Sequence, residues 1–329
     1  ATATDKSSFT IVATASSGLP VSFSSSGAAC THIGARFTID LTTGTCTETM
    51  SQGGNANYLA ATPVIETTTV VPPIAPTVNF TGAPASAHYQ DTFTVVATTN
   101  ASSIPTITAT GACTIDDTTL IVTMTSGTGT CTLTAKWAAD NVYKAASAIQ
   151  RTTAEKLTSI ITWPTPDAIT YGTPLGPLQQ DATASVDGSF AYSPVAGKVL
   201  PAGSQTLKVT FTPTAVKDYT KGTATVELTV DPVGTTTTIT STTPNPSTVG
   251  KTVTVVYTVQ AVTNATKPTG NVTVNASTGE TCTGGLAGGN GSCKLTFTSA
   301  GPRTLTATYA SNSNNWDTSV SAAFTQTVN

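Results

Sequence analysis

The chain has 329 residues, of which only 9% are charged, with a formal net charge of −3 and a pI near 5.3. Nucleic acids and anionic membranes are bound through clusters of Lys and Arg, so this composition excludes both as main partners. No run approaches the roughly 20 apolar residues of a membrane-spanning helix.

Threonine takes the polar positions that charged residues hold in most proteins, and many segments read Thr-Val-Thr-Val. Its branched β-carbon suits the solvent-facing side of a strand, and alternation of apolar and polar residues is the period of a half-buried strand. No window of ten or more residues has helical periodicity. The class predicted is all-β.

One unit recurs four times along the chain: a strand, an aromatic residue, a polar turn and a second aromatic residue. About 12 or 13 residues separate the strand from the second aromatic residue. The four occurrences run from Cys46 to Tyr58, Cys131 to Tyr143, Thr206 to Tyr219 and Thr304 to Trp316. The repeat predicts four tandem modules of immunoglobulin-domain size. Modules one to four are predicted at residues 1–71, 72–155, 156–232 and 233–329.

Module one begins differently from module two. Residues 9–15 (Phe-Thr-Ile-Val-Ala-Thr-Ala) match residues 93–99 (Phe-Thr-Val-Val-Ala-Thr-Thr). About twenty residues precede Phe93 within its module, whereas eight precede Phe9. We therefore expect the first strand of module one to be missing or short. A sandwich of this kind exposes backbone groups and an apolar groove that invite a strand from another chain.

The modules are joined by short segments. Pro72, Pro73 and Pro76 lie in the first joint, and Asp231-Pro-Val-Gly forms the last. Proline fixes φ and removes a hydrogen-bond donor, which makes an extended connection. Short joints between stacked modules predict an extended rod.

Six cysteines allow fifteen pairings, but they fall two to a module, with none in module three. This distribution favours three local disulfides over metal sites: Cys30–Cys46, Cys113–Cys131 and Cys282–Cys293. Persistent disulfides indicate an oxidising, extracellular compartment. The chain begins at Ala1, which we interpret as a mature end after signal cleavage or as a fragment of a longer array.

Nothing in the sequence predicts catalysis, a metal site or a cofactor. His32 and His88 lie in different modules, and no nucleophile elbow, phosphate loop or zinc-protease motif occurs. The repeated aromatic residues have two interpretations, as core residues or as a platform for sugars. They are Trp137, Tyr143, Phe211, Tyr219, Tyr309 and Trp316. Candidate glycan acceptors are Asn79, Asn100, Asn264, Asn271, Asn275 and Asn290.

The segments 268–274 and 291–309 resemble the bacterial Ig-like repeats of large secreted and surface proteins. Module three, through its Ile-Thr-Tyr-Gly-Thr-Pro-Leu segment, is similar to another branch of these repeats. Modules one and two resemble a Gly-x-Cys-Thr variety. The resemblance implies tandem immunoglobulin-like antiparallel sandwiches in surface proteins, adhesins or extracellular fibres. It brings no catalytic residues with it.

These observations predict a non-enzymatic extracellular structural protein, a filament or stalk subunit that assembles head to tail with copies of itself by strand complementation. The assembly residues expected are Phe9, Ile11, Ala322, Phe324 and Val328. The groove would be filled by residues 1–8 of a neighbour or by an edge of its module four. The alternative is a surface adhesin that binds a glycan or a protein through loops at one end of a sandwich.

Overall fold

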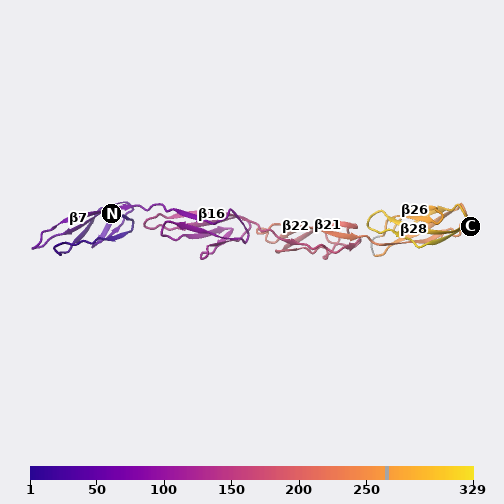
Figure 1. Cartoon of the computed structure of the whole chain (residues 1–329), viewed down its shortest axis with the longest axis horizontal. Coiled ribbons are helices and arrows are strands. Elements are labelled where there is room, and N and C mark those ends of the chain that lie inside the picture. The colour runs from indigo at the N-terminus through magenta and orange to yellow at the C-terminus, as the bar shows by residue number, and fades with distance from the viewer. Residues whose placement is uncertain (264–266) are drawn as a thin grey trace. The chain divides into compact units, whose positions relative to one another are not determined.

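The computed structural model describes residues 1–263 and 267–329, and in this part of the chain all regular structure is β-strand (Figure 1). The all-β prediction is therefore confirmed. By its contacts the chain divides into two compact units. The first contains Ala1–Leu157 and Lys217–Tyr219, and the second contains Thr158–Val216 and Thr220–Asn329. The four module boundaries and the rod remain predictions.

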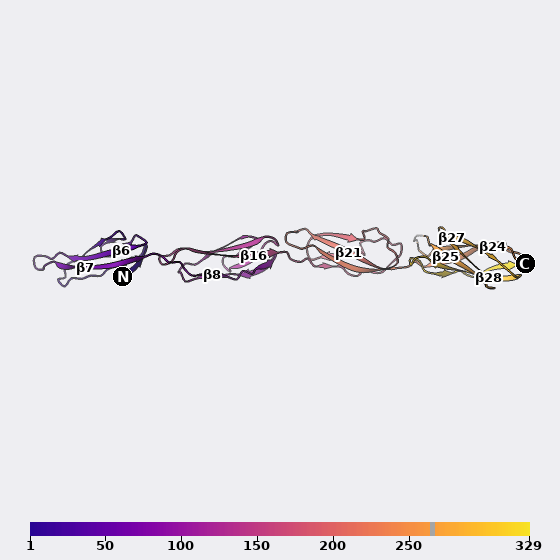
Figure 2. The same ribbon diagram turned by 90° about the horizontal axis from the view of Figure 1, so that it is seen from above.

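Module one consists of two sheets packed around a small core. The strands are β1 (Thr2–Thr4), β2 (Ser8–Thr10), β3 (Ser22–Ser26), β4 (Cys30–Ile33), β5 (Arg36–Ile39), β6 (Gly44–Gln52) and β7 (Ala61–Val71). They are ordered β1-β7-β6-β3 in one sheet and β2-β5-β4 in the other. β1 runs parallel to β7. The N-terminus lies close to β7 in Figures 1 and 2. The buried hydrophobic core is Ala29, Cys30, Phe37, Ile39, Cys46 and Val70.

Module two repeats this arrangement and adds a strand pair. The strands are β8 (Val78–Thr81), β9 (Ser86–His88), β10 (Thr92–Thr94), β11 (Val96–Thr99), β12 (Thr106–Gly111), β13 (Cys113–Ile115), β14 (Ile121–Met124), β15 (Thr130–Trp137) and β16 (Ala146–Glu155). β12-β15-β16-β9 and β10-β14-β13 correspond to the two sheets of module one. The pair β8–β11 has no counterpart in module one, and its Phe80 adds to a larger core.

The second unit holds two further cores. Module three contains β17 (Ile161–Thr162), β18 (Ile169–Thr170), β19 (Thr183–Ala184), β20 (Gly188–Ser193), β21 (Gly203–Pro213) and β22 (Gly222–Asp231). Module four contains β23 (Thr235–Thr243), β24 (Thr252–Ala261), β25 (Gly270–Ala276), β26 (Thr281–Gly285), β27 (Asn290–Thr296), β28 (Gly301–Ser311), β29 (Ser319–Val320) and β30 (Phe324–Val328). Its two sheets are β23-β24-β27 and β26-β25-β28, the latter extended by β29 and β30.

A turn recurs at one place in every module, directly after a parallel pairing to the last strand. In module three β18 pairs with β22, Thr173 N donates to Thr170 O, and Gly172 between them has φ 96°. The residues at the position of Gly172 in the other modules also have positive φ: Lys6 (59°), Gln90 (73°) and Gly250 (79°). This shared turn sets the residue equivalences used below.

Three disulfides join Cys30 to Cys46, Cys113 to Cys131 and Cys282 to Cys293, with Cα–Cα distances of 5.4, 5.2 and 5.7 Å. These distances lie in the ordinary range for a disulfide. Modules one, two and four thus have one covalent link each, and module three has none. The part of the chain that the structure describes contains no helix long and apolar enough to cross a membrane.

Candidate functional site

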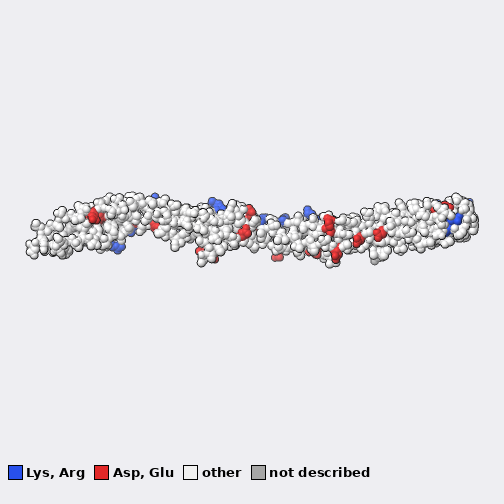
Figure 3. All heavy atoms as spheres, in the orientation of Figure 1, with Lys and Arg blue, Asp and Glu red and all other residues white. Residues whose placement is uncertain are grey.

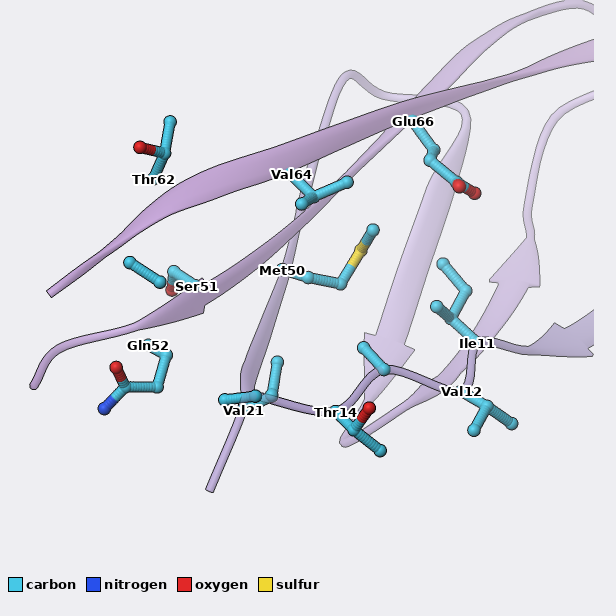
Figure 4. Close-up of a pocket in the computed structure, with 13 residues that line it drawn as sticks. Ile11, Val12, Thr14, Val21, Met50, Ser51, Gln52, Thr62, Val64 and Glu66 are labelled. Carbon is cyan, nitrogen blue, oxygen red and sulfur yellow. The ribbon is translucent and has the colours of Figure 1, made fainter. Parts of the chain in front are cut away.

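The candidate site is a groove in module one. A hollow of about 230 Å³ lies between residues 11–15 and the ends of β6 and β7 (Figure 4). In Figure 4 the side chain of Met50 lies between Val64, on β7, and the segment that carries Val12. Val12 is 89% exposed and Val64 is 56% exposed, so apolar surface stays in contact with water.

Module two explains why the groove is open. Its β8 pairs antiparallel with β11, and Phe80 lies opposite Ala97 in that register. Residues 12–15 of module one hold the position of β11, form no strand, and have no described strand against them. As a result Val95 is fully buried in module two, whereas its counterpart Ile11 is half-buried.

The groove continues toward the N-terminus. A second hollow, of about 680 Å³, is lined by residues 1–4 and 7–12 together with Glu66 and Thr68. It shares Ile11, Val12 and Glu66 with the first hollow. The two hollows are therefore adjacent, and we call them together the strand groove.

Polar anchors in module two show how a strand is held in this position. Ala83 N donates to Gln150 Oε1 at 3.0 Å, and Gln150 Nε2 donates to Phe80 O at 2.8 Å. Thr152 Oγ1 also donates to Pro84 O at 2.8 Å.

The corresponding residues of module one are found from the parallel ladder. Thr153 N donates to Ala85 O, and in the same way Thr69 N donates to Ala1 O, both at 2.9 Å. Glu66 and Thr68 therefore stand where Gln150 and Thr152 stand. Because Ala1 corresponds to Ala85, a strand equivalent to residues 74–84 of module two would lie immediately ahead of Ala1.

A pair of carboxylates lies on the inner face beside the strand groove. Glu48 on β6 is opposite Glu66 on β7 in the antiparallel register, which places both side chains on one face of the sheet. Glu48 is completely buried, and neither of its carboxylate oxygens has a hydrogen-bond partner in the described residues. A buried carboxylate without a partner is strongly unfavourable, so the inner face of module one is chemically incomplete.

The end of the strand groove lies at Tyr58. In module two Ile74 N donates to Val142 O at 3.0 Å and Lys144 N donates to Ile74 O at 2.8 Å. The turn that holds Tyr143 is repeated in module one, since Tyr58 N donates to Asn55 Oδ1 as Tyr143 N donates to Asp140 Oδ1. Asn57 N donates to Asn55 Oδ1 within the turn, but no described strand bonds to Asn57 O or Leu59 N as Ile74 bonds to Val142 O and Lys144 N, and Tyr58 is 53% exposed.

The expected assembly residues lie in different surroundings. Phe9 stacks on Phe37 with ring centroids 5.7 Å apart, and Ile11 lines the strand groove. In module four Val328 is a core residue, Phe324 packs against that core, and Ala322 is exposed. The strand groove thus uses Phe9 and Ile11, while the side chains of Phe324 and Val328 are occupied within their own module.

The other candidate residues do not form a catalytic or metal site. His88 lies 3.5 Å from Asp91 and 3.6 Å from Glu155, all on the surface, and His32 stacks on Phe37. No metal-binding group of His, Cys, Asp or Glu occurs within residues 1–263 and 267–329. The expected acceptor Asn264 lies outside the described residues.

The repeated aromatic residues pack inward. Trp137, Phe211, Tyr309 and Trp316 are buried, and Tyr143 and Tyr219 are partly buried, which favours the core interpretation over a sugar platform. Charged atoms are sparse and scattered on the face shown in Figure 3.

One carboxylate in module two is held by a dense set of donors. Asp140 accepts hydrogen bonds from Ser102 Oγ at 2.7 Å, Val142 N at 2.8 Å and Tyr143 N at 2.7 Å. The Ser102 hydroxyl, followed by the two backbone N–H groups, lowers the pKa of Asp140 to about 2. The carboxylate oxygens of Asp140 therefore accept hydrogen bonds that stabilise this turn.

The carboxylate pair was missed by sequence reasoning. A signal was present, because aligning the disulfide half-cystines Cys46 and Cys131 places Glu48 at the position of the buried Leu133. A carboxylate in place of a core leucine marks a site where the inner face departs from the repeat.

The comparisons with known proteins bear on family and fold. Residues 239–329 match the sequence family described as bacterial Ig-like domain (group 3). No curated protein matches the chain. Similar solved structures include the N-terminal eight Ig domains of DSCAM isoform 1.30.30, with 10% identity, a TM-score of 0.23, and coverage of 100% of this chain and 58% of that one.

Two other solved structures are tandem proteins as well. Titin domains I67–I69 are 14% identical, with a TM-score of 0.31 and coverage of 78% of this chain and 99% of that one. Domains 1–6 of the surface-layer protein SbsC are 16% identical, with a TM-score of 0.23 and coverage of 99% and 53%. The chain thus spans little more than half of the DSCAM and SbsC structures. Residues 239–329 thus match the bacterial Ig-like family (group 3), and the described part of the chain folds as tandem immunoglobulin-like β-sandwiches.

Proposed function

We propose that this chain is an extracellular structural subunit that assembles head to tail, a strand from a second copy filling the strand groove of module one. The observation that carries the proposal is the correspondence between the strand groove and β8 of module two. The same sheets and parallel ladder are present in both modules, and among the described residues only module two has the strand. Glu66 and Thr68 hold the positions of the anchors Gln150 and Thr152.

The chemistry of the strand groove supports a β-strand as its occupant. Residues 12–15 have no described strand against their backbone groups, and Met50, Val64 and Ile11 offer apolar contacts in the same hollow. Main-chain hydrogen bonds and alternate side-chain pockets are the features by which a sheet edge takes up an added strand. Burial of one Phe80-like side chain contributes about 1.5–3 kcal/mol.

The setting of the protein supports an extracellular structural role. Three disulfides fit an oxidising compartment. A head-to-tail contact between unlike surfaces that does not close on itself generates a filament. The fold brings no catalytic residues, and we propose no enzymatic activity.

The test uses a self-complemented chain. Residues 74–84 are placed directly ahead of Ala1, in the register in which Pro84 precedes Ala85, so that the strand groove is filled within the chain. We expect the wild-type chain to form polymers in negative-stain microscopy and sedimentation velocity, and the prefixed chain to stay monomeric. A matched control carries Asp in place of Val78 and Phe80 in the prefix and should regain assembly.

Two outcomes would overturn the proposal. The first is a wild-type chain that stays monomeric at high concentration, which points to an upstream segment of a longer array as the occupant. The second is a prefixed chain that polymerises as well as wild type. Monomers that bind surface glycans or proteins would instead favour the adhesin interpretation.

A further inference from the structure

Modules three and four, which belong to one compact unit, meet through a pair of contacts. Ala202 N in module three donates to Asn315 Oδ1 in module four at 2.8 Å. The Tyr171 ring packs edge-on against Trp316, with centroids 5.5 Å apart and an interplanar angle of 80°. Module four thus supplies a side-chain acceptor and the aromatic residue after it, and module three supplies a backbone N–H and an aromatic ring.

The same pair of contacts occurs in the first unit, which includes residues 217–219. Gly127 N donates to Asp218 Oδ1 at 3.0 Å, and Tyr89 packs edge-on against Tyr219 at 5.5 Å and 80°. Tyr89 and Tyr171 are equivalent, because each donates its N–H to the last residue of the parallel-paired strand, Glu155 or Asp231. The donor differs by one position, because Gly127 lies two residues before Gly129 and Ala202 lies one residue before Gly203. The aromatic contact and the side-chain acceptor are therefore repeated, and the donor comes from the same loop in both cases.

One half of this contact pair is present, without a described partner, at the start of the chain. Asn57 and Tyr58 follow the same Asx turn that precedes Val142 and Tyr143, and they hold the positions of Asn315 and Trp316. The side chain of Asn57 makes no hydrogen bond within the described residues, and the Tyr58 ring is half exposed. We call Asn57 and Tyr58 the head face.

The other half is present at the far end of module four. Val249 N donates to Asn329 O, as Tyr171 N donates to Asp231 O, so Val249 holds the position of Tyr171. Ala300 precedes Gly301 (φ 125°) as Ala202 precedes Gly203 (φ 113°). Val249 is 44% exposed, and no hydrogen bond from Ala300 N occurs within the described residues. We call Val249 and Ala300 the tail face.

We propose that the tail face of one copy docks on the head face of the next, Ala300 N donating to Asn57 Oδ1 and the Tyr58 ring packing on Val249. The inference rests on the proposed function, since it names the surfaces that bring two copies end to end beside the strand groove. The occupant is a second copy because the two faces hold the positions that make the contact between modules three and four. Ala300 and Asn57 repeat Ala202 and Asn315, and an apolar–aromatic pair, Val249 and Tyr58, stands in place of two aromatic rings.

The remaining equivalent positions offer a contrast within the same chain. Asp5 holds the position of Tyr171 in module one, and Val142 holds that of Asn315 in module two. In module one a carboxylate thus replaces the aromatic ring of Tyr171. In module two a valine replaces the side-chain acceptor. The head and tail faces keep both parts of the contact pair, which these two positions have lost.

The contrast supplies substitutions that the fold already accepts. Asn57→Val copies Val142, and Val249→Asp copies Asp5. We expect Asn57→Val to raise the critical concentration for assembly about fivefold, the effect of one neutral hydrogen bond, and Val249→Asp to raise it further by leaving a charge in a desolvated contact. Asn141→Val, in the same loop of module two, is the matched control and should assemble as wild type. Equal assembly of all four chains would overturn the inference and leave strand complementation standing.

A tandem chain tests the contact without relying on self-assembly. Asn329 of one copy is joined to Ala1 of a second through one proline, as at Pro232, and residues 74–84. We expect amide exchange at Ala300 of the first copy to slow at least tenfold relative to the single chain, and to recover with Asn57→Val in the second copy. Unchanged exchange at Ala300 overturns the inference. If exchange at Ala300 slows in the tandem chain but single chains never polymerise, the contact is supported and the proposed function is rejected.

Discussion

Glu48 and Glu66 face each other across β6 and β7, where module two places Leu133 opposite Gln150. The exchange puts two acids on an inner face that in module two holds an apolar side chain and an amide. In module two the amide bonds to the strand that covers it. The acidic pair therefore identifies the part of module one that departs from module two.

Replacing Glu66 with Gln should strengthen strand binding. Gln150 both accepts a hydrogen bond from Ala83 N and donates one to Phe80 O, and an ionised carboxylate can only accept. One recovered hydrogen bond predicts about fivefold tighter binding of a synthetic peptide with the sequence of residues 74–84. Fluorescence anisotropy of the labelled peptide measures this, with Asp117→Asn as the control. Weaker or unchanged binding would contradict the proposed register.

Replacing Glu48 with Leu should stabilise module one. The side chain is fully buried without a partner, and Leu133 shows that leucine fits the equivalent position. An unsatisfied buried polar group costs on the order of 1–3 kcal/mol, more when it is charged. Urea unfolding followed through the module-one transition should therefore shift to higher denaturant. The converse change Leu133→Glu should lower the stability of module two, and a stabilising effect of that change would refute the explanation.

Reduction of the disulfides should lower the stability of modules one, two and four and leave that of module three unchanged. The disulfides close loops with sequence separations of 16, 18 and 11 residues, and module three has none. The chain-entropy model assigns roughly 3 kcal/mol to each such loop. Denaturant unfolding with and without reductant, read out by hydrogen exchange in each module, should show no change in module three. A shift there of the same size as in the others would point to a general effect of the reductant.

Acid should loosen the end of module two. Hydrogen bonds from Ser102 and from two backbone N–H groups lower the pKa of Asp140 to about 2 from an ordinary value of 3.8. The folded pKa lies below the unfolded one, so the stabilisation is complete above about pH 4 and is lost as the pH falls toward 2. The protection of the Tyr143 amide, measured as its exchange rate relative to an unstructured amide at the same pH, should fall across this range in wild type. In Asp140→Ala, this protection should be low at all pH values in the range, and a pH dependence of protection equal to that of wild type would reject the assignment.

Much of the architecture follows from the sequence because its signals are local. Alternating Thr and Val predict strands, and the match between Phe9 and Phe93 locates the segment that lines the strand groove. The carboxylate pair could not be found in this way. Alternation assigns Glu48 a side of its strand, but only the pairing of β6 with β7 brings Glu66 beside it.

The contact pair at the module joints escaped sequence reasoning for a similar reason. Trp316 is predicted to be a core aromatic residue, and it is buried, but part of what buries it is Tyr171 from the preceding module. A pattern repeated in each module describes what the modules share. It does not predict the contacts that one module makes with the next.

The parallel pairing of an early segment with the last strand of each module has a mechanical consequence. In module one β1 runs alongside β7, and the same arrangement recurs as β9 with β16, β18 with β22, and Ser247 with Val328. Tension applied at the two ends of a module draws such strands past each other in opposite directions. Their hydrogen bonds are then loaded in shear, so that all of them bear the force together and must break at once instead of one after another. Each module should therefore unfold in a single step at high force. The parallel pairing between the early segment and the last strand should be the part that resists the force.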